Sequence, residues 1–378
     1  MKAIINGRII LKDRLLDGQA LVFDEKITGF CVAGKIPAGA AVCDAGGAYV
    51  SPGFIDLHCH GYSGEDASDG NPEGIIKMAA GIVKNGVTAW LPTTMTVPVP
   101  NIEKAFDAIR SAKNAIDNKK GAAVLGLNME GPYLNPKRKG AHLEEHLLPP
   151  DKDFILKHSD IIKIVTIAPE VDAEFATTRA SRDAGIVVSI GHSDADYEVS
   201  AAAVANGARH VTHLFNAMSP FNHRDPGVVG AAFNTEISAE FIADTFHIHR
   251  GLFGLLHKIK GDKLVLITDS VRAGGLPDGE YDLGGQKITL NGIECRLSDG
   301  TIAGSVLTMI AAVKNMYLHS GVPIHEVVKC ATLNPATVIG ADDKKGSLEI
   351  GKDADIAVFD NNFRIIKTII KGVDIYEA

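Results

Sequence analysis

Short apolar runs recur along the middle of the chain, and most are followed by a longer segment with helical spacing. An apolar run of about four to eight residues is typical of a buried strand, whereas apolar residues three and four positions apart are typical of a helix. The expected strands are Phe54–Leu57, Thr88–Leu91, Ala123–Met129, Ile161–Ile167, Ile186–Ile190, His210–Phe215, Glu240–Ala243 and Leu264–Ile267. The expected helices include Gly74–Asn85, Asn101–Asn118, Ala173–Ala184, Tyr197–Asn206 and Gly251–Lys260.

This alternation predicts an α/β fold, a (β/α)8 barrel of the TIM type. The segments between the expected strands are long enough for the crossover connections that parallel strands require. A doubly wound open sheet is the competing topology. It ranks lower because no GxGxxG turn follows the first expected strand.

The two ends of the chain have a different pattern, in which short apolar runs alternate with Gly, Asp and Asn turns. Fewer than about fifty residues of strand bury little surface by themselves, so we expect the two ends to pair. We predict a small β-sandwich domain formed by residues 1–50 and 345–378, flanking a catalytic barrel domain over residues 51–344. Residues 273–303 are predicted as a further β excursion without an assigned function.

Composition narrows the class of protein. Of the 378 residues, 46% are hydrophobic and 22% are charged, which is typical of a soluble globular protein. The formal net charge of −8 argues against a nucleic-acid partner, which would require a basic surface. No apolar run is long enough to cross a membrane, and the first residues lack the apolar core of a signal peptide. The five cysteines form no disulfide framework, so we expect a cytoplasmic protein.

Candidate metal ligands begin with the first expected barrel strand, which ends in His58 and His60. Residues two apart in a strand point to the same side, so both imidazoles face one way. A His-x-His pair alone is weak evidence for a metal, because such pairs also arise by chance. The other expected strands therefore decide whether a site exists.

Metal-competent side chains also lie at the ends of four further expected strands, and barrel enzymes place their active sites at this end of their strands. Glu130 follows the third, His192 the fifth and Asp269 the eighth, while His213 lies near the end of the sixth. Any one of them could be an ordinary polar strand end. Together with His58 and His60 they predict a metal site, because clustered buried histidines and carboxylates are costly without a cation.

Several motifs extend the pattern beyond these ligands. They are Gly53–Gly61 (GFIDLHCHG), Glu130–Tyr133 (EGPY), Lys139–His142 (KGAH), Gly191–Ser193 (GHS), Thr212–Met218 (THLFNAM), Arg224–Gly227 (RDPG), Gly275–Gly279 (GLPDG) and Gly346–Asp360 (GSLEIGKDADIAVFD). The first and the last resemble the amidohydrolase superfamily as a whole. The others, in this order, resemble more narrowly the N-acetylglucosamine-6-phosphate deacetylases, a family within it. The resemblance runs through nearly the whole chain.

The resemblance implies hydrolysis of the acetamide of N-acetylglucosamine 6-phosphate to acetate and glucosamine 6-phosphate by metal-activated water. Glu130, His192 and His213 match the shared metal ligands, while His58 and His60 match the pair that creates a second site in two-metal members. With both histidines present we expect two divalent ions per chain, bridged by Glu130, although one-metal members exist. Whether the metal is Zn, Fe, Mn or Co stays open.

The same resemblance implies roles around the metal. Asp269 matches the general base and acid, and it also belongs to the expected ligand set. His142 matches the residue that stabilises the oxyanion or binds the sugar. Asn216 and Ala217 would offer amide groups to the phosphate. Arg224 and His247 match phosphate contacts at a subunit interface, which implies a homodimer acting on a small phosphorylated amino sugar.

Two other functions stay open from the residues alone. A different amidohydrolase, such as a cyclic-amide hydrolase or a nucleobase deaminase, would keep the histidines and Asp269 but has no need of the KGAH motif, Arg224 or His247. A non-catalytic relative that uses the barrel as an interaction scaffold would be free to lose ligands. This chain retains every expected one.

Overall fold

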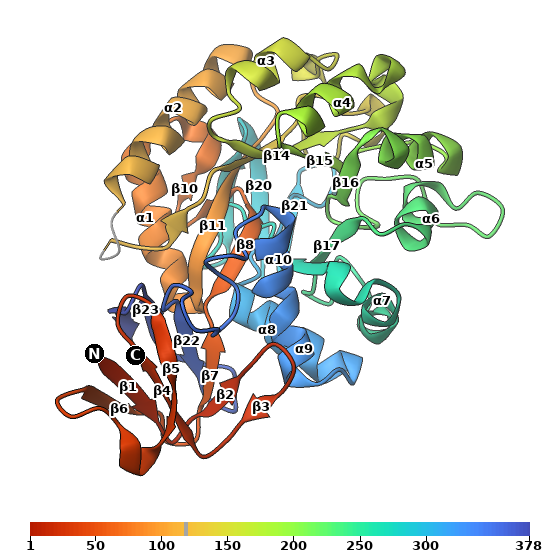
Figure 1. Ribbon diagram of the computed structural model, residues 1–378. Helices are drawn as coiled ribbons and strands as arrows, with labels where there is room; N and C mark the ends of the chain where they lie inside the picture. The colour runs from red at the N-terminus through yellow and green to blue at the C-terminus, as the bar shows by residue number, and fades with distance from the viewer. Residues whose placement is uncertain (117–119) are drawn as a thin grey trace.

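The computed structural model describes residues 1–116 and 120–378 and has a barrel at its centre (Figure 1). The parallel barrel strands, named in order around the sheet, are β8 (Phe54–Cys59), β11 (Val87–Thr94), β13 (Leu127–Glu130), β14 (Ile162–Ile167), β15 (Val187–Ile190), β16 (Ala208–Val211), β17 (Ser238–Ile242) and β18 (Leu264–Ile267). The short strand β12 (Ala123–Val124) pairs with β11. Nearly complete closure comes from the amide of Asp269, which donates to the His58 carbonyl over 2.9 Å.

Helices cover the outside of the barrel, and apolar strand residues such as Leu57, Val165 and Phe241 belong to the main apolar cluster. The helices are α1 (Pro72–Ile82), α2 (Val99–Ala115), α3 (Lys152–Lys157), α4 (Ala176–Asp183), α5 (Tyr197–Asn206), α6 (Gly227–Asn234), α7 (Phe253–Lys260), α8 (Met309–Ser320), α9 (Ile324–Cys330) and α10 (Leu333–Val338). Helix α1 shows why they form: the Asn71 side chain caps it, Pro72 occupies its first position, and Ile75, Met78 and Ile82 are buried on one face.

The predicted (β/α)8 architecture is confirmed for the described residues, with differences at the ends of elements. The expected strand Ala123–Met129 is split into β12 and β13 at Gly126, where a side chain would collide with the neighbouring Lys163 and Ile161. The expected strand His210–Phe215 was too long, because β16 ends at Val211. The predicted end of the second helix, at residues 117 and 118, lies outside the described residues.

Two further sheets are formed by the ends of the chain. One has the order β5 (Ile27–Val32), β4 (Gln19–Phe23), β1 (Lys2–Ile5) and β6 (Ala41–Asp44). The other has the order β24 (Val373–Glu377), β23 (Ile365–Ile370), β22 (Ile356–Phe359), β7 (Tyr49–Pro52), β2 (Arg8–Ile10) and β3 (Leu15–Leu16). A shared apolar cluster that includes Leu21, Phe23, Val50 and Ile356 packs between them, as in a β-sandwich. The domain limits at residues 50 and 345 stay a prediction.

A small antiparallel sheet lies within residues 273–303, where a β excursion was expected. Its strands are β19 (Gly279–Leu283), β20 (Gln286–Asn291) and β21 (Glu294–Leu297). Its apolar face, which includes Leu283 and Ile288, packs with Met95 and Val271 beside the barrel mouth. A short hairpin of β9 (Gly61–Tyr62) and β10 (Glu65–Asp66) follows β8.

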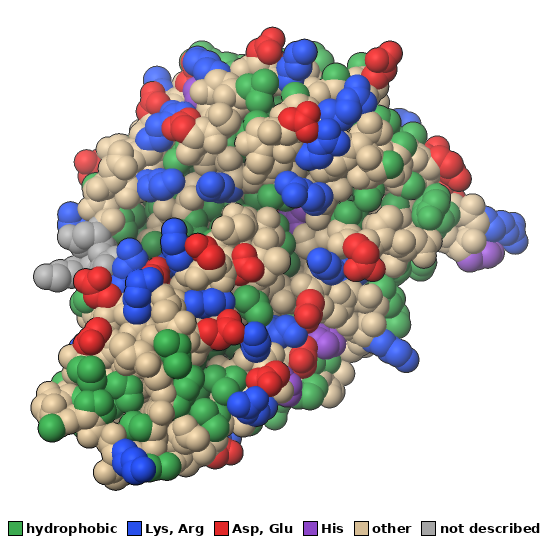
Figure 2. Space-filling view, in the orientation of Figure 1, with side chains coloured by type: hydrophobic (Ala, Val, Ile, Leu, Met, Phe, Trp, Pro, Cys, Tyr) green, Lys and Arg blue, Asp and Glu red, His purple; other side chains and the backbone are tan. Residues whose placement is uncertain are grey.

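The surface carries charges of both signs. Figure 2 shows basic and acidic side chains interspersed over the face that Figure 1 presents. Neither sign gathers into a single patch on this face. Within the described ranges, no helix has both the length and the apolar character required to span a bilayer.

Candidate metal centre

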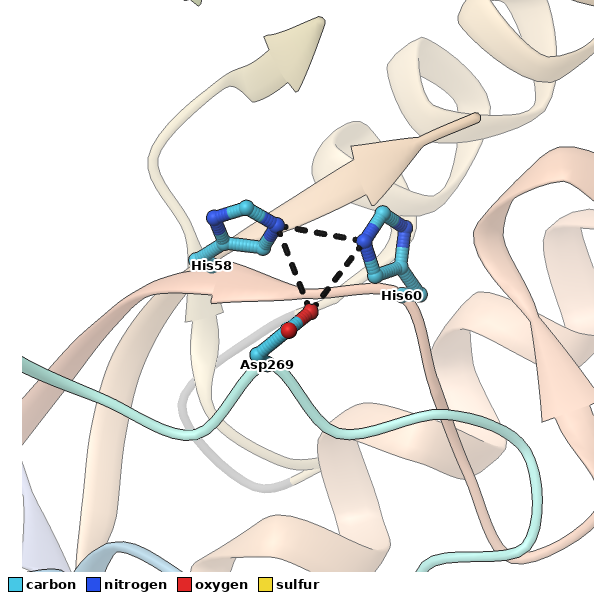
Figure 3. A group of neighbouring side chains, drawn as sticks. All are labelled: His58, His60 and Asp269. Carbon is cyan, nitrogen blue, oxygen red and sulfur yellow. Dashed lines mark hydrogen bonds and ion pairs between the residues drawn. The ribbon is translucent and has the colours of Figure 1, made fainter. Parts of the chain in front are cut away.

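His58 and His60 point to the same side at the end of β8, as the strand alternation predicts (Figure 3). Their Nε2 atoms are 3.1 Å apart. The Oδ1 atom of Asp269, two residues beyond β18, lies 3.5 Å from Nε2 of His58 and 3.4 Å from Nε2 of His60. All three side chains are buried, so the structure brings these predicted site residues into one group.

Hydrogen bonds on the far side of each ring fix which nitrogen faces the site. Nδ1 of His58 lies 2.9 Å from a carboxylate oxygen of Glu240, and Nδ1 of His60 lies 3.1 Å from the carbonyl oxygen of Thr93. Both partners are acceptors, so each Nδ1 carries a proton, and each Nε2 is the nitrogen that offers a lone pair when the ring is neutral. Two lone pairs 3.1 Å apart repel one another, and a cation between them satisfies both.

Glu130, at the end of β13, joins this group to a second one. Its Oε1 lies 3.1 Å from Nε2 of His192 and 2.9 Å from Nε2 of His213, and these two nitrogens are 3.1 Å apart. Its Oε2 lies 3.0 Å from Nε2 of His60 and 3.5 Å from Nε2 of His58. The carboxylate therefore stands between the two histidine pairs, in the position that a bridging ligand requires.

The second group also presents lone pairs and suits a divalent metal. Nδ1 of His192 donates to the carbonyl of Arg138 over 2.8 Å, so its Nε2 is free to act as a ligand. Within the described part of the chain, Nδ1 of His213 has no partner. A donor set of imidazole nitrogens and carboxylate oxygens fits Zn, Fe, Mn or Co without selecting one of them.

The backbone turns sharply at three of these residues. His192, His213 and Asp269 follow β15, β16 and β18, and their φ angles are 49°, 27° and 50°. A left-handed conformation in a residue other than glycine costs on the order of 1–3 kcal/mol and persists only where its surroundings impose it. Here the amide of His213 donates to Glu240 over 3.0 Å, which holds the turn and excludes Thr212–Phe215 from the strand.

The electrostatics of the site keep both acids ionised. Burial would raise the pKa of Glu130, but His58 and His192 hold it well below its usual range. Burial likewise opposes the lowered pKa of Asp269, which His58 and His60 cause. Burial would lower the pKa of His60, whereas Asp269 and Glu130 raise it to about 9. The two carboxylates thus favour positive charge at this site, carried either by protons on the imidazoles or by a metal cation that takes their place.

His142 lies against the same carboxylate. Its Nδ1 accepts a hydrogen bond from the amide of Thr96 over 3.2 Å, so its Nε2–H faces Oε2 of Glu130 at 3.4 Å. Burial lowers the pKa of His142 to about 4, although Glu130 opposes this. His142 is therefore neutral at pH 7 and can donate a hydrogen bond from Nε2.

A cavity of about 250 Å³ opens beside these groups. Asn216, Ala217 and His247 line it, together with Glu130, His142, His192, His213 and Asp269. Residues on or beside the small sheet, such as Leu283 and Ile302, form part of its wall. Arg224 does not line the cavity. Its side chain is exposed, and it belongs to the loop of residues 219–226 that precedes α6 (Figure 1). One chain therefore does not bring Arg224 to the other predicted phosphate contacts.

The residues behind the candidate ligands were not expected from the sequence. Glu240 and His210 are fully buried, and Nε2 of His210 lies 3.2 Å from Oε1 of Glu240. Glu240 is the one charged residue in the buried barrel strand β17, and a buried charge requires partners. That signal was present in the sequence. The contacts of His60 and His192 with backbone carbonyls could not be predicted in this way, because every residue has a backbone carbonyl.

Comparison with known proteins gives consistent results. The amidohydrolase family model matches residues 49–374. The chain is 40% identical over 328 residues to the N-acetylglucosamine-6-phosphate deacetylase of Bacillus subtilis (strain 168), covering 85% of this chain and 83% of that protein. It is 38% identical over 381 residues to the enzyme of that name from Haemophilus influenzae, covering 98% of each. It is also 34% identical to the N-acetylgalactosamine-6-phosphate deacetylase of Escherichia coli O157:H7, covering 97% of each.

Solved structures show the same similarity. N-acetylglucosamine-6-phosphate deacetylase from Pasteurella multocida superposes with a TM-score of 0.95 at 34% identity, covering 100% of both chains. The Mycobacterium smegmatis enzyme of that name, as an aspartate-to-alanine variant in complex with N-acetyl-D-glucosamine-6-phosphate, superposes with a TM-score of 0.92. Its identity to this chain is 28%, and the match covers 99% of each chain.

Proposed function

The chain belongs to the amidohydrolase family and is a metal-dependent hydrolase, and from this premise we propose that it deacetylates N-acetylglucosamine 6-phosphate. The products would be acetate and glucosamine 6-phosphate. The observation that carries the proposal is the Glu130 carboxylate, which stands between two histidine pairs and lines a cavity of about 250 Å³.

Each cation position has its own donors. Glu130, His192 and His213 would hold one divalent ion, and His58 and His60, with the opposite oxygen of Glu130, would hold a second. Asp269 lies within 3.5 Å of both nitrogens of the second pair and can complete its set. When bound, a divalent cation would polarise the amide carbonyl and lower the pKa of water to about 7.

Asp269 would move the protons of the reaction. As a carboxylate in the cavity wall, it can accept a proton from the water that attacks the acetyl carbon. The same proton then passes to the sugar nitrogen as the carbon–nitrogen bond breaks, which releases the amine and acetic acid. The second proton of the water leaves with the acid and is taken up by the amine, so the final products are acetate and the ammonium form of the sugar. Asp269 returns to its ionised form, so the cycle consumes one water and balances.

His142 would act on the acetyl oxygen or on the sugar. The Thr96 amide fixes its tautomer, so Nε2–H points towards the cluster and can donate a hydrogen bond to the oxygen on which negative charge develops. A neutral imidazole suits this role because it does not compete with the cations for the carboxylates.

The phosphate would bind at the opposite end of the cavity. Asn216 and Ala217 can offer amide groups there, and His247 lines the same region with its Nδ1 2.6 Å from Asp244. Arg224 would complete the site from a second copy of the chain, which is the reason we propose a homodimer. We propose a cytoplasmic location, because all five cysteines are free thiols.

The decisive experiment measures acetate release from purified protein of known metal content. The substrates are N-acetylglucosamine 6-phosphate, its 4-epimer N-acetylgalactosamine 6-phosphate, and unphosphorylated N-acetylglucosamine. The 4-epimer is included because one relative carries that name at 34% identity. The proposal predicts the highest kcat/KM for the first substrate and loss of turnover after chelation, with recovery on adding a divalent metal. Higher kcat/KM for the 4-epimer would reassign the substrate, and acetate release that survives metal removal would overturn the mechanism.

A further inference from the structure

Glu240 is a charged side chain in the interior of the barrel that the proposed reaction does not use. It lies on β17, a barrel strand without a proposed metal ligand, and it is fully buried. An ionised carboxylate in this position is strongly disfavoured unless neighbouring donors satisfy both of its oxygens.

Both oxygens have donors, and one oxygen serves both cation positions. Oε2 accepts from Nδ1–H of His58 over 2.9 Å and from the backbone amide of His213 over 3.0 Å. Oε1 lies 3.2 Å from Nε2 of His210, whose Nδ1 is 2.6 Å from the Ser238 hydroxyl. His58 and His213 belong to different histidine pairs, so Glu240 touches one member of each.

We propose that Glu240 is a positioning residue that holds one ligand of each cation position and thereby couples the two positions. This inference rests on the proposed two-metal function. The bond to Nδ1 fixes the tautomer and ring orientation of His58, so that its Nε2 lone pair faces the site. The bond to the amide of His213 holds the φ angle of 27° that turns this residue towards Glu130.

The effect of losing Glu240 on metal affinity distinguishes a positioning role from a purely structural one. A residue that served only β16 and β17 packing would change the stability of the metal-free protein and leave metal affinity alone. A residue that oriented only His58 would weaken one ion. Because one oxygen holds both ligands, its loss is expected to weaken both.

The test titrates metal-free protein with Co²⁺ by equilibrium dialysis and records the visible absorption of the bound ions. Glu240→Gln keeps the shape but removes the charge, and Glu240→Asp keeps the charge but shortens its reach. Both variants are expected to bind two Co²⁺ ions 10- to 100-fold more weakly than the unmodified protein, with an altered spectrum. Glu236→Gln, the same chemical change at an exposed residue four positions earlier, is the matched control and should leave both affinities unchanged.

Thermal unfolding of the metal-free variants separates positioning from stability. Unchanged affinities in a folded variant would overturn the proposal, as would weakening at one position only. If neither variant folds, the carboxylate is a folding element and the proposal is also overturned. If the unmodified protein itself binds no Co²⁺, the proposed metal-dependent function fails instead.

Discussion

The proton on the outer nitrogen of each ring decides what His58, His60 and His192 can do. Acceptors on Glu240, Thr93 and Arg138 hold that proton on Nδ1, so that Nε2 is the nitrogen able to bind a metal. In His142 the arrangement is reversed, because the Thr96 amide donates to Nδ1. A single contact at Nδ1 therefore decides whether a histidine of this site can bind a metal or can donate a hydrogen bond.

Asp269→Asn is expected to lower kcat by about 100-fold or more, because the amide is nearly isosteric but cannot accept the proton from water. Acetate release from N-acetylglucosamine 6-phosphate measures the loss. Glu130, His192 and His213 should still bind a divalent ion, as metal analysis of the same preparation will show.

Asp343→Asn, the same change at an exposed position, serves as the control for Asp269→Asn and should be indistinguishable from the unmodified enzyme. A kcat for Asp269→Asn above about a tenth of the original would assign the proton transfer to another group, since general-base catalysis contributes at least about 100-fold.

His58→Gln combined with His60→Asn is expected to reduce the metal content from two ions per chain to one. The substitutions replace both lone-pair donors of one position with amides and leave Glu130, His192 and His213 in place. Metal analysis of protein purified without chelators measures the stoichiometry. Two ions per chain in the double variant would contradict the assignment.

At the scale of elements, the segment that connects α10 to β22 contains a buried ion pair centred on the ammonium group of Lys345. Nζ of Lys345 lies 2.6 Å from Asp355 and 3.1 Å from Asp353, and all three side chains are largely buried. The carbonyl of Asp355 accepts from the amide of Gly53, just before β8 begins. This ion pair therefore stabilises the junction between the C-terminal strands and the first barrel strand.

Lys345→Met is expected to destabilise the protein by about 3–5 kcal/mol, because it leaves two buried carboxylates without their cation. Urea unfolding measures the change, and Lys344→Met at the exposed neighbour is the control. A loss below about 1 kcal/mol would show that solvent reaches these carboxylates.

The ion pair also has a pH dependence with a definite sign. Burial would lower the pKa of Lys345, but Asp355 and Asp353 raise it above the usual 10.5. A raised lysine pKa contributes stability that is fully present below pH 10.5 and is lost as the pH rises through the folded-state value. The difference between Lys345→Met and the unmodified protein should therefore shrink above about pH 10.5.

At the scale of the whole molecule, Arg224 lies outside the cavity of its own chain while His247 lines it. A homodimer in which this loop reaches the neighbouring cavity would bring them together. A guanidinium suits this role because it binds phosphate through a planar fork of two donors.

Arg224→Ala is expected to lower kcat/KM for N-acetylglucosamine 6-phosphate by about 10- to 100-fold, the size of one lost charge-assisted hydrogen bond. The slow reaction of unphosphorylated N-acetylglucosamine should hardly change. Arg209→Ala, an exposed arginine at the start of β16, is the control. An equal fall for both substrates would make Arg224 a structural residue.

Mixing Arg224→Ala subunits with Asp269→Asn subunits tests whether the site is shared. Each mixed dimer would contain one cavity with both residues intact, so acetate release should partly recover. No recovery after verified subunit exchange would place Arg224 in the same chain as the Asp269 that it serves.

Local patterns in the sequence were enough to predict the barrel and most residues of the candidate site. The alternation of apolar runs with helical spacing indicated the barrel, and the period of two in a strand put His58 and His60 on one side. The strand ends identified Glu130, His192, His213 and Asp269 because parallel barrel strands all finish at one mouth. These inferences depend on the period and direction of the chain, and both are local properties.

Distances between strand ends were decided only by closure of the barrel. His213 lies 83 positions from Glu130 in sequence, yet its Nε2 is 2.9 Å from the carboxylate. The left-handed turn at His213, which ends β16 early, exists because Glu240 on the next strand binds its amide. The exclusion of Arg224 from the cavity likewise follows from where its loop lies. Hydrophobic periodicity specifies which face of an element is buried, but tertiary packing alone sets which polar atoms then meet.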